Sequence, residues 1–367
     1  MQTKGKKVVV AMSGGVDSSV SAALLKEQGF DVVGAFMKCW STSATPQRDG
    51  NAEDFPGGEC SSEEDEYWAR RAAAHLGIPF YSFDLVDEYK KRVVDYFIAE
   101  YNAGRTPNPD VMCNSEIKFG VFFDKVMATF GADYIATGHY ARARHEADGS
   151  VVLLRGRDAN KDQSYFLYRV GADRLAKTLF PVGEYEKPKV RELAKKFGLP
   201  NANKKDSQGI CFIGNVDMKE FLRGRVSAKP GRVVTATGEV VGEHEGMAYY
   251  TIGQRKGIGS FGGGIPYYVI GKNTEKNELV VGMAYDADLS RDTATITDVS
   301  WIGEEPQASK VYTASIRYRQ KPQEVTVTKE GDVFVLHFAQ SQRAVTEGQS
   351  AVLYDGDVVI GGGIIEK

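Results

Sequence analysis

Near its amino terminus the chain reads Val8-Val9-Val10-Ala11-Met12-Ser13-Gly14-Gly15-Val16-Asp17-Ser18-Ser19. The consecutive valines predict a buried strand of a parallel sheet, because strands covered on both faces are continuously apolar. From Ser18 to Gln28 apolar residues recur at helical spacing, which predicts a helix. The stretch therefore predicts a strand, a tight glycine turn and a helix in succession.

The turn between this strand and this helix is suited to binding phosphate. Gly14 and Gly15 let the backbone approach a ligand closely, so that N–H groups at the helix start can point at an anion. Ser13, Ser18 and Ser19 add hydroxyl donors. The Gly-Lys-Ser/Thr ending of a Walker loop is absent, so a kinase or a GTPase is not indicated. A Gly-Gly turn alone is more often an ordinary turn, but the full string resembles the PP-loop of enzymes that split ATP into AMP and pyrophosphate.

The composition indicates a cytosolic protein with two or three domains. The chain has 367 residues, of which 42% are hydrophobic, enough for several cores. It contains no run of about 18 apolar residues, which predicts no membrane span. Its first residues lack the apolar stretch of a signal peptide. We therefore expect a cytoplasmic location and no membrane partner.

Net charge and cysteine spacing limit the partners and the metals. The formal net charge of −3 gives no overall attraction to nucleic acid, so local basic patches would have to hold an RNA. The cysteines lie far apart, without a Cys-x-x-Cys pair or a histidine at ligand spacing; they are Cys39, Cys60, Cys113 and Cys211. We expect reduced thiols and no stable metal site made of protein ligands.

Strand and helix patterns alternate through the amino-terminal half. We expect strands at Asp31–Met37 and Phe80–Asp84, and helices at Glu63–Leu76 and Asp87–Tyr101. Such alternation predicts a doubly wound α/β fold, a parallel sheet with helices on both faces. Ligands of these sheets bind beyond the carboxyl ends of the strands, which is where the turn at Ser13 is placed.

A proline-stiffened segment follows. It reads Gly104-Arg105-Thr106-Pro107-Asn108-Pro109-Asp110-Val111-Met112-Cys113-Asn114 and precedes a predicted helix at Ile117–Phe130. The prolines favour an extended loop that leaves Asp110 and Cys113 near a helix start. The helix dipole there favours a thiolate, although Asp110 opposes it. An isolated cysteine is more often a buried apolar residue, but the polar loop favours a reactive thiol at Cys113.

Three later segments also carry polar residues. The predicted strand Asp133–Tyr140 ends in Gly138, which would let the backbone approach adenine or ribose, and in His139, which suits a proton carrier, a phosphate partner or a structural histidine. The turn Arg155–Ser164 suits a phosphate or base contact as well as an ordinary exposed turn. The predicted helix Lys187–Phe197 supplies a local basic patch.

The carboxyl-terminal part is predicted to form two smaller units. Beyond Arg225 helical periodicity gives way to short Val/Thr/Tyr-rich runs separated by glycine turns, which predicts a small central domain and an antiparallel β-barrel. The predicted boundaries are 1–217, 218–283 and 284–367. Arg317-Tyr318-Arg319-Gln320-Lys321 offers a basic aromatic strand to nucleic acid, although a solvated strand face has the same pattern.

Taken together, these segments resemble the bacterial-type tRNA 2-thiouridylases, which place sulfur on C2 of the wobble uridine. The PP-loop is shared by many enzymes, whereas the two cysteine contexts together are particular to this family. The matching motifs are Ala11–Ser18, Asn108-Pro109-Asp110 with Cys113-Asn114, Ala136-Thr137-Gly138-His139-Tyr140, Lys161-Asp162-Gln163-Ser164, Gly209-Ile210-Cys211-Phe212-Ile213-Gly214 and Arg317-Tyr318-Arg319.

The resemblance implies a reaction. Attack of the uridine oxygen on the α-phosphate of ATP would turn that oxygen into a good leaving group, with Mg²⁺ and the loop N–H groups stabilising pyrophosphate. Cys211 would carry a persulfide received from a cysteine desulfurase or a relay protein. Cys113 would either form a transient disulfide with Cys211 or first liberate sulfide. Asp110 would act as a general base, and Asn108 and Pro109 would line the base pocket.

The resemblance also implies two sets of binding residues. The ATP site would comprise Ala11, Met12, Ser13, Gly14, Gly15, Val16, Asp17, Ser18, Met37 and Gly138, with Asp17 acting through Mg²⁺. On its pattern alone, Met37 is equally compatible with ordinary core. The tRNA contacts would be Asn108, Pro109, Asp110, His139, Lys161, Asp162, Gln163, Arg317, Tyr318 and Gln349.

Two other functions fit parts of the sequence. A PP-loop synthetase or amidotransferase acting on a small molecule would form AMP without tRNA, but it leaves the barrel and both cysteine segments unexplained. A non-catalytic tRNA-binding or redox-sensing protein would bind tRNA without releasing pyrophosphate and would be insensitive to Asp17→Ala. The resemblance favours the sulfurtransferase over both.

Overall fold

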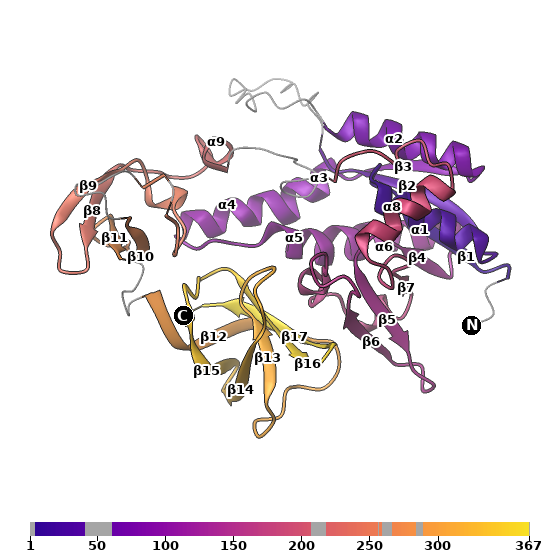
Figure 1. Ribbon diagram of the computed structural model, residues 1–367. Coiled ribbons are helices and arrows are strands. Elements are labelled where there is room, and N and C mark those ends of the chain that lie inside the picture. Colours follow the sequence, from indigo (N-terminus) through magenta and orange to yellow (C-terminus); the bar gives the residue numbers. More distant parts are fainter. Residues whose placement is uncertain are drawn as a thin grey trace.

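A five-stranded parallel sheet organises the amino-terminal part of the chain (Figure 1). The computed structural model describes residues 4–40, 61–206, 218–255, 257–258, 266–283 and 289–366. The strand order is β3-β2-β1-β4-β7, and β2 and β4 flank β1 on opposite sides. The strands are β1 Lys7–Ala11, β2 Asp31–Lys38, β3 Phe80–Asp84, β4 Tyr134–Ala136 and β7 Thr178–Leu179. The predicted parallel sheet is confirmed, and its strand order reverses between β1 and β4.

Helices cover both faces of this sheet because successive residues of β1 point to opposite sides. Val8 and Val10 pack in one apolar cluster with α1 and α2, whereas Val9 packs in another with α4 and α6. The helices of this part are α1 Val16–Glu27, α2 Ser61–Leu76, α3 Val86–Tyr89, η1 Lys90–Val94, α4 Asp95–Asn102, α5 Pro109–Met112, η2 Cys113–Val121, α6 Phe122–Phe130, η3 Ser164–Leu167, α7 Ala172–Leu175 and α8 Lys187–Lys196. The predicted doubly wound arrangement is therefore confirmed.

Three sequence-based element predictions need correction. The strand expected at Arg317–Lys321 is a bend and a turn, because the preceding strand β13 already ends at Ser315. The helix expected at Ile117–Phe130 already begins at Pro109, because Asn108 caps it and a proline suits the first helical position. The strand expected at Asp133–Tyr140 is confined to Tyr134–Ala136, and the chain then turns towards the start of α1. A hairpin of β5 (Ala141–His145) and β6 (Val151–Arg155) follows, which the sequence did not predict.

The remaining chain forms two further sheets. The central one has the order β10-β11-β8-β9, with β8 Gly231–Thr235, β9 Val240–His244, β10 Tyr268–Asn273 and β11 Glu278–Gly282; α9 Met218–Leu222 and η4 Met247–Tyr249 lie in the same part. The other comprises β12 Ser290–Trp301, β13 Tyr312–Ser315, β14 Gln323–Glu330, β15 Val333–Arg343, β16 Ser350–Asp355 and β17 Val358–Ile365. Because β12 pairs with both β15 and β17, this sheet closes into the predicted antiparallel barrel.

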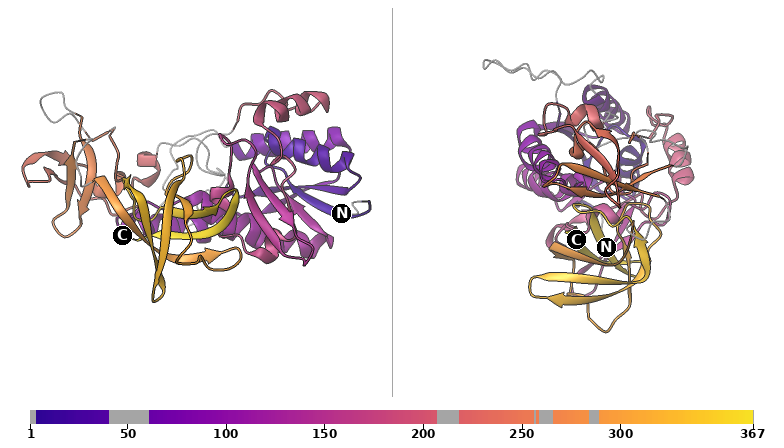
Figure 2. Two further views of the ribbon diagram at one scale, coloured as in Figure 1. Left: turned by 60° about the horizontal axis from the view of Figure 1, so that its bottom comes forward. Right: turned by 90° about the vertical axis from the view of Figure 1, so that its left-hand side faces the viewer.

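The barrel is joined to the amino-terminal part through the unpredicted hairpin. Strand β6 pairs with β17, and the Tyr165 hydroxyl donates to the Ser350 carbonyl oxygen over 2.8 Å. The central sheet lies beyond the end of α4, and the barrel lies beside both (Figures 1 and 2). Within the described ranges, no helix combines the length and the apolar character that a membrane crossing requires.

Candidate active site

The predicted nucleotide turn lies at the carboxyl end of β1, beside the point where the strand order reverses. Gly14 has a φ of 74°, and α1 begins after Gly15 without a capping hydrogen bond from a described side chain. The Ser13 N–H instead donates to Ser18 Oγ over 3.1 Å, which folds the turn back onto the helix. The start of α1 therefore keeps its positive dipole end and its first N–H groups for an anion.

Gly138 brings the end of β4 against this helix start. A Cβ atom at Gly138 would lie 2.6 Å from the backbone nitrogen of Ser18, so only glycine fits there. Met37, at the end of β2, is 4% exposed and packs in the apolar cluster that contains Val9 and Cys39. The structure thus places Gly138 at the turn. Met37 lies among core residues at the end of β2, the strand beside β1.

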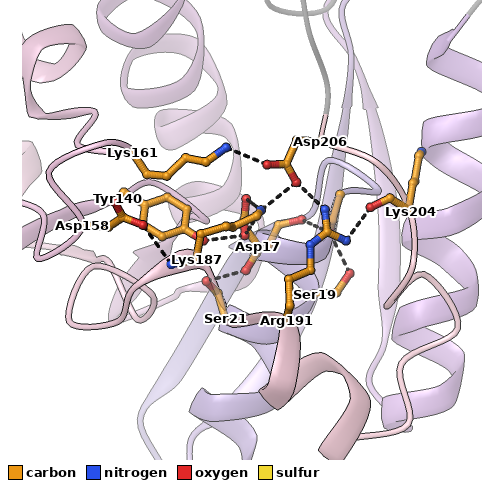
Figure 3. Close-up of polar contacts among 12 residues, drawn as sticks. Asp17, Ser19, Ser21, Tyr140, Asp158, Lys161, Lys187, Arg191, Lys204 and Asp206 are labelled. Carbon is orange, nitrogen blue, oxygen red and sulfur yellow. Dashed lines mark hydrogen bonds and ion pairs between the residues drawn. The ribbon is translucent and has the colours of Figure 1, made fainter. Parts of the chain in front are cut away.

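Asp17, in the first turn of α1, is the centre of an ion network (Figure 3). The Lys187 ammonium contacts both of its carboxylate oxygens, at 2.7 and 2.8 Å, and the Tyr140 hydroxyl donates to one of them over 2.8 Å. Lys187 also lies 2.9 Å from Asp206, and its side chain is only 12% exposed. A buried cation thus joins the nucleotide turn to a second carboxylate.

Asp206 in turn binds three cations, since Lys161 donates to it over 2.7 Å and Arg191 contacts it as well. Burial alone would raise the pKa of Asp206, but the hydrogen bonds from Lys161 and Lys187 outweigh it and hold that pKa well below its ordinary value. Burial and the neighbouring Asp17 raise the pKa of Tyr140, so that its hydroxyl keeps its proton as a donor. At neutral pH Asp206 is therefore ionised and the Tyr140 hydroxyl keeps its proton.

The sequence analysis missed Lys187, Asp206 and Arg191 as site residues. One signal was available, because Lys187 is the first residue of α8. A cation is unfavourable at that end of the helix dipole, which indicates a specific anionic partner. No comparable signal marked Asp206, because its partners come from segments distant in the sequence.

Asn201 fixes the backbone of the glycine turn and leaves a buried acceptor beside it. The Asn201 side-chain amide donates to the Gly14 and Gly15 carbonyl oxygens over 2.9 and 3.2 Å, while its buried Oδ1 has no partner among the described residues. Those residues contain no cluster of three or more potential metal ligands.

The segment from Asn108 to Cys113 forms the second part of the site. Asn108 Oδ1 accepts from the N–H groups of Asp110 and Val111 at 3.2 and 3.3 Å, and Asp110 is half-buried. Cys113 is one turn into the helix, fully buried, and belongs to the same apolar cluster as Cys39. The prediction that Cys113 lies in a polar loop is therefore wrong. The helix begins earlier than predicted and places the thiol in the apolar cluster.

The predicted partner of Cys113 lies outside the described residues, and so does the whole Gly209–Gly214 motif around Cys211. Asn114, which follows Cys113, donates from its amide to the Phe166 carbonyl oxygen over 3.2 Å. The Phe166 ring centroid is 4.4 Å from that of Tyr318 on the barrel. This chain of contacts brings the barrel residue Tyr318 close to the cysteine helix.

Several predicted tRNA contacts use their polar atoms inside the protein. His139 is 8% exposed and lies near the rings of Phe119 and Phe180; burial, and then Lys118, lower its pKa well below the ordinary value, so it stays neutral. Asp162 accepts from the Gly156 and Ser164 N–H groups. Gln163 Oε1 accepts from the Tyr140 N–H over 3.0 Å. These side chains shape the turns around the nucleotide site.

The barrel carries a basic pocket of about 520 Å³. Its lining includes Arg317, Tyr318, Arg319, Gln320, Gln323, Gln340, Ser341, Gln342 and Arg343. Burial, together with the nearby Arg343, lowers the pKa of Arg317. Arg317 and Tyr318 thus share one pocket, whereas Gln349 lies elsewhere and bonds to the segment before Asn108.

The fold and this site define a class, the PP-loop proteins with a HUP nucleotide-binding domain. Family comparison agrees: residues 6–215 match the family model described as tRNA methyl transferase HUP domain. Residues 219–283 match the tRNA methyl transferase PRC-barrel domain, and residues 291–365 match the aminomethyltransferase beta-barrel domain.

Curated relatives identify the family within this class. The chain is 49% identical, over 98% of its length and 95% of the relative's, to tRNA-specific 2-thiouridylase MnmA of Streptococcus sanguinis (strain SK36). It is 50% identical, over 98% of its length and 96% of the relative's, to the protein of the same name from Shouchella clausii (strain KSM-K16). The chain belongs to the tRNA-specific 2-thiouridylase family.

Among solved structures, the chain resembles a 4-thiouridine synthetase in complex with RNA and ATP. The identity is 18%, the TM-score is 0.34, and the match covers 60% of this chain and 50% of the other. A likeness this low carries no argument about function.

Proposed function

We propose that this chain is a tRNA-uridine 2-sulfurtransferase that uses ATP to replace the C2 oxygen of the wobble uridine by sulfur, forming 2-thiouridine, AMP and pyrophosphate. The observation that carries the proposal is the 49% identity to a tRNA-specific 2-thiouridylase over 98% of the chain. The glycine turn at the start of α1 supports the ATP-dependent half of the reaction. We assign 1–217 to the catalytic domain, 218–283 to a central domain and 284–367 to the barrel, close to the ranges of the family models.

The first step activates the uridine. Its O2 attacks the α-phosphorus of ATP, the new O–P bond forms, and the bond to the β-phosphate breaks to release pyrophosphate. The N–H groups of the turn, with Ala11–Ser18 and Gly138 around them, bind the nucleotide, and Met37 lies beside the adenine. Asp17 would hold Mg²⁺, which supplies charge neutralisation for the phosphates. Asp110 takes the N3 proton of the uridine as general base.

The second step transfers sulfur. The outer sulfur of a persulfide on Cys211 attacks C2, and AMP leaves with the original oxygen. Cys113 then attacks the inner sulfur of Cys211; the Cys113–Cys211 bond forms, and the electrons of the broken persulfide bond stay on the transferred sulfur. In the alternative order, Cys113 makes this attack first and releases sulfide, which attacks C2. A thiol reductant must restore both cysteines after either route.

Burial of Cys113 adds a requirement to this mechanism. Its side chain is fully buried, so a thiol can reach Sγ only from within the protein. The contacts from Asn114 through Phe166 to Tyr318 give tRNA on the barrel a physical route to the cysteine helix.

We propose tRNA contacts through Asn108, Pro109, Lys161, Arg317 and Tyr318, whose side chains are partly exposed. For Asp162 and Gln163, contact with tRNA would have to coexist with the internal hydrogen bonds described above, and for His139 with its burial. The target base must leave its stack to reach such a site. We propose a cysteine desulfurase or a relay protein as sulfur donor, and a cytoplasmic location, where tRNA and ATP are available.

The test is nucleoside mass spectrometry on unmodified tRNA incubated with the protein, Mg-ATP, cysteine and a cysteine desulfurase. We expect 2-thiouridine with the wild-type protein and none with Cys113→Ala, Cys211→Ala or Asp17→Ala. Cys39→Ala is the matched control, because Cys39 is buried in the same cluster as Cys113 but has no proposed chemistry.

The other outcomes separate the competing functions. Pyrophosphate release without tRNA, and without thiouridine, would favour a small-molecule synthetase. Binding of tRNA without pyrophosphate release would favour a non-catalytic protein. A methylated uridine in place of 2-thiouridine would contradict sulfur transfer directly.

A further inference from the structure

The segment Gly104–Pro107, which joins α4 to the cysteine helix, is held by a turn of the barrel. The Thr106 N–H donates to the Glu347 carbonyl oxygen over 2.9 Å. The Gln349 side-chain amide donates to the carbonyl oxygens of Thr106 and Pro107 over 2.7 and 3.2 Å. Three hydrogen bonds thus join residues that lie more than two hundred positions apart. We call the turn Glu347–Gln349 the barrel clamp.

The barrel clamp is built for close approach. Gly348 has a φ of 86°, and a Cβ atom there would lie 2.9 Å from both the nitrogen and the carbonyl carbon of Thr106. Glycine is therefore needed for the backbone conformation and for the contact. The clamp is also anchored in its own domain, since the Gly348 N–H donates to the Ile365 carbonyl oxygen and the Ile365 N–H donates to that of Gln349. A shift of β17 would consequently move the clamp.

The central domain holds the same segment from another side. The Lys272 ammonium on β10 donates to the Gly104 carbonyl oxygen over 2.9 Å, and the hydroxyls of Thr251 and Thr106 lie 3.3 Å apart. The segment leads directly into Asn108, Asp110 and Cys113. Both smaller domains therefore meet at the backbone that sets the position of the cysteine helix.

We propose that Gln349 is a positioning residue, whose amide fixes the Thr106 and Pro107 carbonyls and thereby makes the barrel part of the framework of the sulfur-transfer site. The inference rests on the proposed function for its chemistry, but its structural half concerns the free protein. This role is separate from the tRNA contact expected for Gln349, because it rests on two hydrogen bonds from the amide nitrogen to carbonyl oxygens of this chain. Loss of the amide removes both hydrogen bonds and loosens the segment that leads into the cysteine helix.

The test compares Gln349→Met, which keeps the side-chain length but has no donor, with Gln307→Met at an exposed barrel position. We expect Gln349→Met to slow single-turnover thiolation by roughly 10- to 100-fold, with tRNA affinity within about twofold of wild type, because a small displacement of reacting groups is costly. Amide hydrogen exchange in the free protein should accelerate in residues 104–113, about tenfold or more, because the local opening becomes easier. Gln307→Met should change none of these quantities.

Two results would overturn the inference. If tRNA affinity falls by the same factor as the thiolation rate and exchange is unchanged, Gln349 is a tRNA contact. If exchange rises throughout the barrel, the substitution has unfolded that domain, and Gln349→Glu is measured instead. Unchanged exchange in residues 104–113 of Gln349→Glu, with the barrel intact, would refute the positioning role of Gln349. Should the wild-type protein form no thiouridine, the proposed function fails while the exchange data still test the clamp.

Discussion

Lys187 shows how much of the nucleotide site depends on one side chain. It opens α8, at the helix end where a cation is disfavoured, yet it bridges the carboxylates of Asp17 and Asp206. A triphosphate brings several negative charges to the turn after β1. The Lys187 ammonium is held at the start of α1, where an anion bound by the turn would lie within its field.

We expect Lys187→Ala to lower the rate of pyrophosphate formation by roughly 10²- to 10³-fold, as for loss of one preorganised charge partner. Binding of tRNA should be unchanged. The measurements are single-turnover pyrophosphate release and a tRNA titration. Lys189→Ala is the control, because Lys189 is exposed on the same helix and pairs with Glu192. Wild-type rates in Lys187→Ala would remove Lys187 from the site.

At the scale of elements, Lys272 on β10 bonds to Gly104 in the segment before the cysteine helix. Burying its charge there costs folding free energy. Burial lowers the pKa of Lys272 to about 8 from its ordinary 10.5, and the nearby Glu347 only partly opposes this. Between these two pH values the folded state binds fewer protons than the unfolded state. The free energy of unfolding therefore rises with pH in that window, and the cost of the buried charge is fully present below pH 8.

We accordingly expect the melting temperature of the wild type, relative to Lys272→Met, to be constant below about pH 8 and to rise from there towards pH 10.5. The variant lacks the hydrogen bond to Gly104 at every pH. This loss shifts the difference in melting temperature by a constant and does not change how that difference depends on pH. Thermal unfolding of both proteins in matched buffers is the measurement. A difference that does not depend on pH would mean that Lys272 titrates normally.

At the scale of the whole molecule, a chain with a net charge of −3 has to hold an RNA by local charge. The barrel pocket gathers Arg317, Arg319 and Arg343, and Tyr318 connects it to the cysteine helix through Phe166. The barrel thus provides the basic surface that Arg317–Lys321 predicted, and it also touches the site, which no local pattern predicted.

We expect Arg319→Ala to weaken tRNA binding and to reduce the slope of log affinity against log salt by about 1, the signature of one lost phosphate contact. Binding titrations over a range of salt concentrations measure it. Lys329→Ala is the control, since Lys329 is an exposed barrel cation paired with Glu305, away from the pocket lining. An equal change in both variants would point to general charge instead of a pocket.

The sequence by itself determined many of the elements and the class. Local patterns predicted β1, the glycine turn and α1, because apolar periodicity and glycine conformations depend only on near neighbours in the chain. The alternation of strands and helices predicted the parallel sheet, and the later short runs predicted the barrel. Motifs in order along the chain were enough to predict the family that the comparisons identify.

The tertiary structure alone decided which of these residues meet. Lys187 reaches Asp17 from 170 positions away, and Gln349 reaches Thr106 from 243. The inward position of Cys113 follows from a helix that begins at Pro109, and His139 is neutral because apolar rings surround it. Charge pairing and burial depend on which elements the topology packs together, and no local pattern in the sequence encodes that packing.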